Sequence, residues 1–268
     1  MENCSAVYGV MALALNDAFG VDNIALLLAL LIGVSLGALG SGGSIVTLPV
    51  LVYVAGVDPK AAVGMSMAIV GATSLLGSYV HRRNGNFLFK AVVLFGAPGM
   101  VGAYVGSMGT HLVSSAALML QFSTLMLVVG GLMLAGKQMP GAASAHCSPY
   151  RCIPAGFLVG SVTGFLGVGG GFLILPALMW FAGLNAKKAV GTSLGIIAVN
   201  SAAGLIGQLR YAQWDWVLTG EFIVCSLIGM SLGIPIAKRM PEHALRKAFG
   251  AAVVAVALAI GWQVLGRR

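Results

Sequence analysis

Charged residues are scarce in this chain, and their scarcity decides the class of protein. They make up 8% of the 268 residues, whereas hydrophobic residues make up 59% and the mean hydropathy is +0.97. Soluble domains carry about a quarter charged residues. A water-soluble globule of this composition would expose a large apolar surface, so a soluble fold is excluded. We therefore expect an all-α integral membrane protein.

Cysteine is also scarce, and its scarcity excludes a fold held together by many disulfides. The chain has 4 Cys, and its 39 Gly follow no three-residue period, so collagen-like classes are excluded as well. His146, Cys147 and Cys152 share one loop but offer only three ligands at unusual spacing. We expect reduced thiols there, with no metal and no cofactor.

Acidic residues are outnumbered 7 to 15 by Lys and Arg, which gives a net charge of +8. No basic run is interleaved with aromatic residues, so we expect no nucleic-acid partner and assign the surplus to cytoplasmic loops. The seven acids all fall at the ends of apolar segments or in loops, and no His lies mid-segment. A buried proton relay and an enzyme active site therefore lack candidates.

Apolar segments recur in two similar sets. In each set the first two segments are short, and the last three reach the roughly 20 residues needed to cross a bilayer. The first set comprises residues 24–40, 43–56, 61–80, 87–108 and 117–136, and the second comprises 153–167, 170–183, 189–209, 214–237 and 244–265.

The two sets are copies of one unit. A shift of 127 positions aligns residues 33–83 with the second half without a gap, and Pro49 and Lys60 fall on Pro176 and Lys187. The domains predicted are an outward-facing N-terminal lead-in (1–23), a first membrane repeat (24–136), a cytoplasmic linker (137–152) and a second membrane repeat (153–268).

Loop charges set the expected orientation of the halves. If each short pair forms a hairpin that enters and leaves on one side, each half crosses three times and the second half is inverted. A hairpin that crosses fully twice gives the same orientation, and loop charge does not separate the two cases. This topology collects most basic residues inside, although Arg267 and Arg268 fall outside. The inner residues are Arg82, Arg83, Lys90, Lys137, Arg151, Lys187, Lys188, Lys238, Arg239, Arg246 and Lys247. We expect two inverted repeats, each a Gly-broken helix hairpin plus three transmembrane helices.

Glycine runs separate the short segments of each pair. A new helix starts after each run, and its unpaired N–H groups and dipole attract anions, which can approach closely where side chains are missing. Packing alone is the alternative explanation for such glycines. The predicted substrate-binding residues are Gly42, Gly43 and Ser44 in the first half and Gly169, Gly170 and Gly171 in the second.

Other small-residue motifs predict close helix packing and no site. Four Gly-x-x-x-Gly pairs lie inside the apolar segments, where such spacing lets helix backbones approach each other. They are Gly33 with Gly37, Gly102 with Gly106, Gly160 with Gly164, and Gly229 with Gly233.

Polar residues within the long apolar segments complete the candidate site. Ser66 and Ser193 occupy equivalent positions in the two halves, and Asn200 follows in the second. Serine hydroxyls can instead bond their own helix backbone. Asn200 is the strongest of the three, because a full amide needs several partners in lipid.

The duplicated motif resembles that of a known family. Gly-x-Leu-Gly-x-Gly-Gly, then Leu-Pro-x-Leu and Lys-x-Ala-Val-Gly-x-Ser, is similar to the pattern of the sulfite exporter family named for TauE and SafE. The resemblance implies a permease for sulfite, sulfonates and sulfoacetate. The halves differ where Ser44 aligns with Gly171 and Met65 with Thr192.

Together these features predict a multi-pass permease or exporter of small sulfur-containing anions in the bacterial inner membrane. An inside-negative potential drives anions outward by about 2.3 kcal/mol per 100 mV, so no obligatory proton coupling is expected. The expected partners are a small anionic substrate and the lipid bilayer, and a homo-oligomer is compatible with the sequence. The alternatives are a channel for small neutral solutes, which here lacks an Asn-Pro-Ala motif, and a non-transport membrane subunit or enzyme.

Overall fold

The computed structural model describes residues 21–39, 42–134, 149–166, 171–209 and 214–239, with 247, 251, 253–258, 261 and 262. Every regular element in these ranges is a helix, which confirms the all-α prediction. Within the same ranges five helices are long and apolar enough to cross a membrane. They are Pro59–Arg83, Phe89–Gly109, Ser115–Leu132, Lys187–Gln208 and Trp216–Pro235. The predicted segment 244–265 lies largely outside the described residues.

Both halves follow one order of helices. The first half contains α2 (Val21–Leu39), α3 (Gly42–Tyr53), α4 (Pro59–Arg83), α5 (Phe89–Ala91), the π-helical turn η1 (Val92–Gly96), α6 (Ala97–Gly109), the 3₁₀ turn η2 (Thr110–Leu112) and α7 (Ser115–Leu134). The second contains α8 (Pro149–Leu166), α9 (Gly171–Phe181), α10 (Ala186–Gln208) and α11 (Trp216–Arg239). A shift of 127 positions places α2, α3 and α4 on α8, α9 and α10.

Local capping signals set the starts of the long helices. Asp58 caps α4 by accepting a hydrogen bond from the backbone N–H of Lys60 at 2.9 Å. Asn185, the equivalent residue, caps α10 by accepting from Lys188 N–H at 3.0 Å. Such side chains satisfy N–H groups that the first helical turn leaves unpaired.

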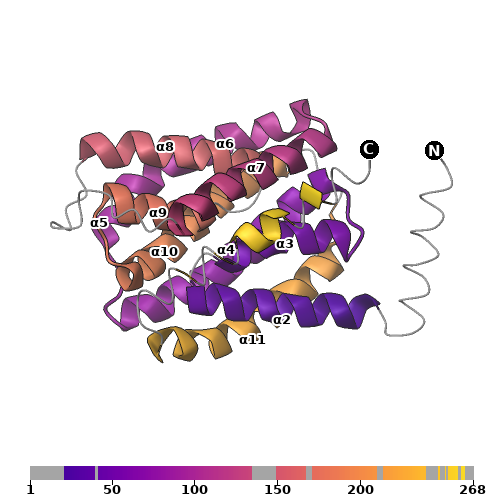
Figure 1. The fold of residues 1–268 in the computed structure, drawn as a ribbon, viewed down its shortest axis with the longest axis horizontal. Coiled ribbons are helices and arrows are strands. Elements are labelled where there is room, and N and C mark those ends of the chain that lie inside the picture. Colours follow the sequence, from indigo (N-terminus) through magenta and orange to yellow (C-terminus); the bar gives the residue numbers. More distant parts are fainter. Residues whose placement is uncertain are drawn as a thin grey trace.

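The halves exchange packing partners. Helix α2 packs along α11, and its counterpart α8 packs along α6, while α4 packs on α10 and α3 contacts α9. Figure 1 shows the α6–α8 pair and the α2–α11 pair at opposite edges, with α3, α4, α9 and α10 between them. The first helix of each half is thus held mainly by the fourth segment of the other.

The Gly-x-x-x-Gly motifs lie at those two edge interfaces, which confirms the packing prediction. A Cβ added at Gly33 would meet the carbonyl oxygen of Ser226, and one at Gly160 would meet that of Gly99. Gly229 and Gly102 face backbone atoms of the partner helices in the same way. Glycine is required here because the neighbouring atoms belong to main chain, which cannot rotate aside.

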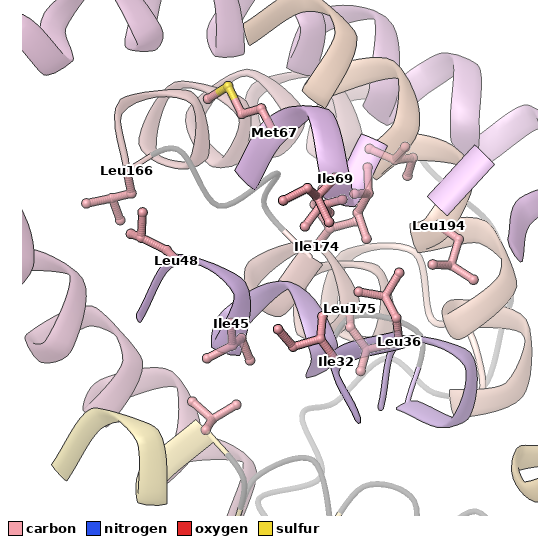
Figure 2. Packing of buried hydrophobic residues seen from close by; sticks show 14 of the residues in the cluster. Ile32, Leu36, Ile45, Leu48, Met67, Ile69, Leu166, Ile174, Leu175 and Leu194 are labelled. Atoms are coloured by element: carbon pink, nitrogen blue, oxygen red, sulfur yellow. The ribbon is translucent and has the colours of Figure 1, made fainter. Parts of the chain in front are cut away.

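Apolar side chains fill the space among the central helices. Figure 2 shows Ile45 and Leu48 of α3 in one cluster with Ile174 and Leu175 of α9, and Leu194 of α10 belongs to the same core. Large apolar residues also cover the outside, as on α6, α7 and α11. An apolar exterior is expected where lipid surrounds the helices.

Candidate substrate site

The candidate site centres on the starts of α3 and α9. Helix α2 ends at Leu39 and a new helix, α3, begins at Gly42, within the predicted glycine run. Helix α8 ends at Leu166 and α9 begins at Gly171, so Gly169 and Gly170 lie outside the described residues. Both new helices are short, with 12 and 11 residues, and they contact each other.

Gly43 has a clear packing role. A Cβ at this position would meet the carbonyl oxygen of Ile32, with Leu36 Cδ1 at 2.7 Å and Leu36 N at 2.8 Å. Glycine therefore lets the first turn of α3 lie directly on α2. Its contribution to anion binding through the backbone amide stays a prediction, as does that of Gly42.

Ser44 is fully buried in the first turn of α3. The shift of 127 positions places it on Gly171, which begins α9 and is also buried. The first half therefore adds a hydroxyl where the second has only backbone. The role of Ser44 and Gly171 as substrate ligands stays a prediction.

Ser66 and Ser193 lie buried at equivalent places in α4 and α10. The Ser66 hydroxyl donates to the carbonyl of Val63 at 2.9 Å, and the Ser193 hydroxyl donates to that of Val190 at 2.8 Å. These bonds within one helix turn satisfy hydroxyls in an apolar surrounding. A substrate contact by either serine stays a prediction.

Asn200 differs from both serines because its amide is unsatisfied. Its side chain is 2% exposed, and neither Oδ1 nor Nδ2 has a hydrogen-bond partner. The amide lies against α6, since a Cβ built on Gly99 would stand 2.9 Å from each of these two atoms. An unpaired buried amide costs free energy, so this position favours a polar ligand or water over simple packing.

Two further hydroxyls, not among the predicted site residues, also lack partners. Ser74 on α4 and Ser201 on α10 are buried, and neither hydroxyl oxygen makes a hydrogen bond. Ser201 lies at the α4–α10 contact, where its Cβ would be 3.1 Å from a Cβ on Gly71. The sequence signal was present, because the two serines are repeat equivalents within apolar helices.

Fixed charge is missing from the buried part of the described chain. The buried polar residues there are Ser, Thr, Asn and Gln together with His81, and they include no Asp, Glu, Lys or Arg. Any anion bound among these helices would therefore be held by neutral donors and backbone dipoles. In the same part of the chain no group of three or more His, Cys, Asp or Glu residues is placed to hold a metal.

One expectation about cysteine is wrong. Cys152 is disulfide-bonded, whereas a reduced thiol was expected for it. Cys152 also lies in the first turn of α8 and not in the predicted loop, and the spacing of the cysteines did not predict its pairing. A sulfur already in a disulfide is not available as a thiolate metal ligand.

The π-helical turn η1 was not foreseen from the sequence. It interrupts the span Phe89–Gly109, whereas the equivalent span in the second half, α11, is a continuous α-helix. Pro98, which follows the turn, has no N–H to donate and so disturbs the regular hydrogen-bond ladder. π-Turns occur often at functional sites.

Comparison with known proteins places the chain among transporters. The family model described as sulfite exporter TauE/SafE matches residues 25–260. A probable membrane transporter protein of Xylella fastidiosa (strain Temecula1) is 38% identical over 243 residues, covering 87% of this chain and 92% of the relative. The probable membrane transporter protein YdhB of Bacillus subtilis is 27% identical over 230 residues, covering 83% and 93%. No solved structure matches the chain.

Proposed function

The chain belongs to the sulfite exporter TauE/SafE family, and from this premise we propose that it exports small sulfur-containing anions such as sulfite and organosulfonates. It is a multi-pass membrane transporter. In the proposed mechanism, the N-termini of α3 and α9 hold the anion at the interface of the halves, and membrane potential drives it across.

One observation carries the proposal. Two short helices, α3 and α9, begin at equivalent glycine runs and contact each other among the longer helices. Helix N-termini leave N–H groups unpaired and concentrate roughly half a positive charge. Two such ends supply an anion with donors and a favourable field without any lysine or arginine.

We further propose that the two halves are inverted repeats. The exchange of partners, α2 with α11 and α8 with α6, is the pattern that a two-fold axis between the halves produces. Loop charge supports an axis in the membrane plane, with the 137–152 linker in the cytoplasm. The disulfide at Cys152, in the first turn of α8, favours the opposite topology, with the linker outside, because such bonds persist mainly in oxidising compartments.

Accessibility labelling separates these two topologies. With single cysteines placed at Asn84 and at Gly56 in a cysteine-free background, we expect a membrane-impermeant thiol reagent to label only the second position in intact cells. Asn84 follows α4 and Gly56 precedes it, so the two positions report opposite ends of one spanning helix. Labelling only of the cysteine at position 84 would show the opposite topology, with the linker outside.

A proline substitution tests the helix-end site. Gly171→Pro removes one N–H donor from the start of α9 at a position where proline fits a helix. Losing one donor to a charged ligand should reduce sulfite flux in proteoliposomes about tenfold or more.

Ala186→Pro is the matched control. It places proline at the first position of α10, where the equivalent residue in the first half is already Pro59. This variant should retain wild-type flux. Equal flux for Gly171→Pro and Ala186→Pro, with both proteins folded, would contradict the proposed role of the α9 terminus.

A further inference from the structure

The unsatisfied amide of Asn200 points to the protonation state of the substrate. We infer that Asn200 binds the singly protonated form of a sulfur oxyanion, hydrogensulfite, through a paired donor and acceptor contact. The inference rests on the proposed function and deepens it. It selects one ionic form among the sulfur anions that the transporter family suggests.

The position of the amide supports this role. Asn200 lies on α10 opposite Gly99, and one helical turn earlier Ile196 packs near Gly96, the last residue of the π-turn η1. The amide thus lies where α10 meets the irregular part of the η1–α6 span. Both its Oδ1 and its Nδ2 are buried without partners.

The chemistry of an amide then limits the ligand. Nδ2 donates two hydrogen bonds and Oδ1 accepts, so a full partner must present an acceptor and a donor side by side. Hydrogensulfite offers S–O acceptors and an O–H donor. A sulfonate group, sulfate and the sulfite dianion offer acceptors only and leave Oδ1 unpaired.

The absence of fixed charge favours the same form. The buried residues of the described chain include no Lys or Arg, so nothing there compensates a second negative charge. Burying an uncompensated charge is costly, and a dianion is costlier than a monoanion. Neutral donors therefore suit a singly charged anion.

The equivalent position in the other half offers a control. Thr73 stands where the repeat places Asn200, and its hydroxyl donates to the Ile69 carbonyl of its own helix at 2.7 Å. It has no comparable unsatisfied group. The binding feature is consequently present in only one half of an otherwise duplicated core.

Apart from His81, the titratable groups described on the helices around α10 are exposed or partly exposed. Lys187 and Lys188 are in the first turn of α10, and Tyr104 on α6 is exposed. Arg151 lies at the start of α8, and the end of α4 carries Tyr79, His81, Arg82 and Arg83, with Lys60 at its start. Of these, only His81 is buried, so it is the group whose titration a pH experiment must control.

The test compares Asn200→Leu with Thr73→Val in proteoliposomes at fixed total sulfite and several pH values. Leucine keeps the branched shape of asparagine but carries no polar side-chain atom, so the variant leaves no buried donor or acceptor unpaired. Wild-type flux should fall as pH rises and hydrogensulfite becomes sulfite, while Asn200→Leu should lose about tenfold or more at acidic pH. Thr73→Val should follow the wild type.

A second variant and a binding measurement complete the test. His81→Gln, which introduces the residue of the equivalent position Gln208, should keep the wild-type pH profile. Sulfite at acidic pH should raise the melting temperature of the wild type and not that of Asn200→Leu, since a ligand stabilises only a state that binds it.

The outcomes are distinct. A folded Asn200→Leu with wild-type flux and melting shift would overturn the inference while the proposed function stands. A pH profile lost in His81→Gln would also overturn it. Neither flux nor a melting shift for wild-type protein with any sulfur anion would overturn the proposed function together with the inference.

Discussion

Gly229→Leu is expected to abolish the folded protein, whereas Gly220→Leu on the same helix is expected to leave it intact. A side chain at Gly229 would meet the carbonyl oxygen of Leu30, with Leu30 C at 2.9 Å and Val34 N at 3.0 Å. These are backbone atoms of α2 and cannot rotate aside. Inserting a bulky group there should cost about 3 kcal/mol or more.

The control is built into α11. A Cβ at Gly220 has no atom within 4 Å, so leucine there meets open space. Size-exclusion profiles and thermal unfolding in detergent measure both variants. A melting temperature for Gly229→Leu equal to that of Gly220→Leu would show that α2 and α11 are not held by close backbone contact.

Membrane potential is expected to set the substrate gradient. For an uncoupled monovalent anion, 100 mV corresponds to about 2.3 kcal/mol, which equals roughly a fiftyfold concentration ratio at equilibrium. A divalent anion would square that ratio. Measuring the sulfite distribution across proteoliposomes at several imposed potentials gives the charge moved per substrate.

A proton-coupled transporter would behave differently. Carriage of hydrogensulfite alone equalises its concentration and so collects total sulfite on the alkaline side of a pH gradient. Sulfite accumulation at zero potential beyond that ratio, lost when the pH gradient collapses, would contradict potential-driven export. The described chain has no buried Asp or Glu, and its buried His81 lies in the last turn of α4, so we expect export driven by membrane potential.

Much of the fold was predictable because membrane helices carry their own signals. Hydrophobic length and the glycine runs predicted the ends of α2 and α8, at Leu39 and Leu166, and the starts of α3 and α9, at Gly42 and Gly171. Glycine spacing identified the packing positions. The identity of each packing partner was not predictable, because a Gly-x-x-x-Gly motif marks a contact surface without specifying the helix that covers it.

The site was less predictable than the fold. Asn200 was predictable as a polar residue in an apolar helix, and the structure adds that its amide lies unpaired against Gly99. Ser66 and Ser193 were also predicted as site residues, below Asn200, yet their hydroxyls bond their own helices. The π-turn η1 depends on the local hydrogen-bond register near Pro98, which hydropathy does not encode.

The most direct test of anion export is a comparison of sulfite with glycerol in the same proteoliposomes under an imposed potential. We expect sulfite flux above that of empty vesicles, increasing with potential, and no protein-dependent glycerol flux. Glycerol flux without sulfite flux would instead indicate a channel for neutral solutes and contradict the anion site at α3 and α9.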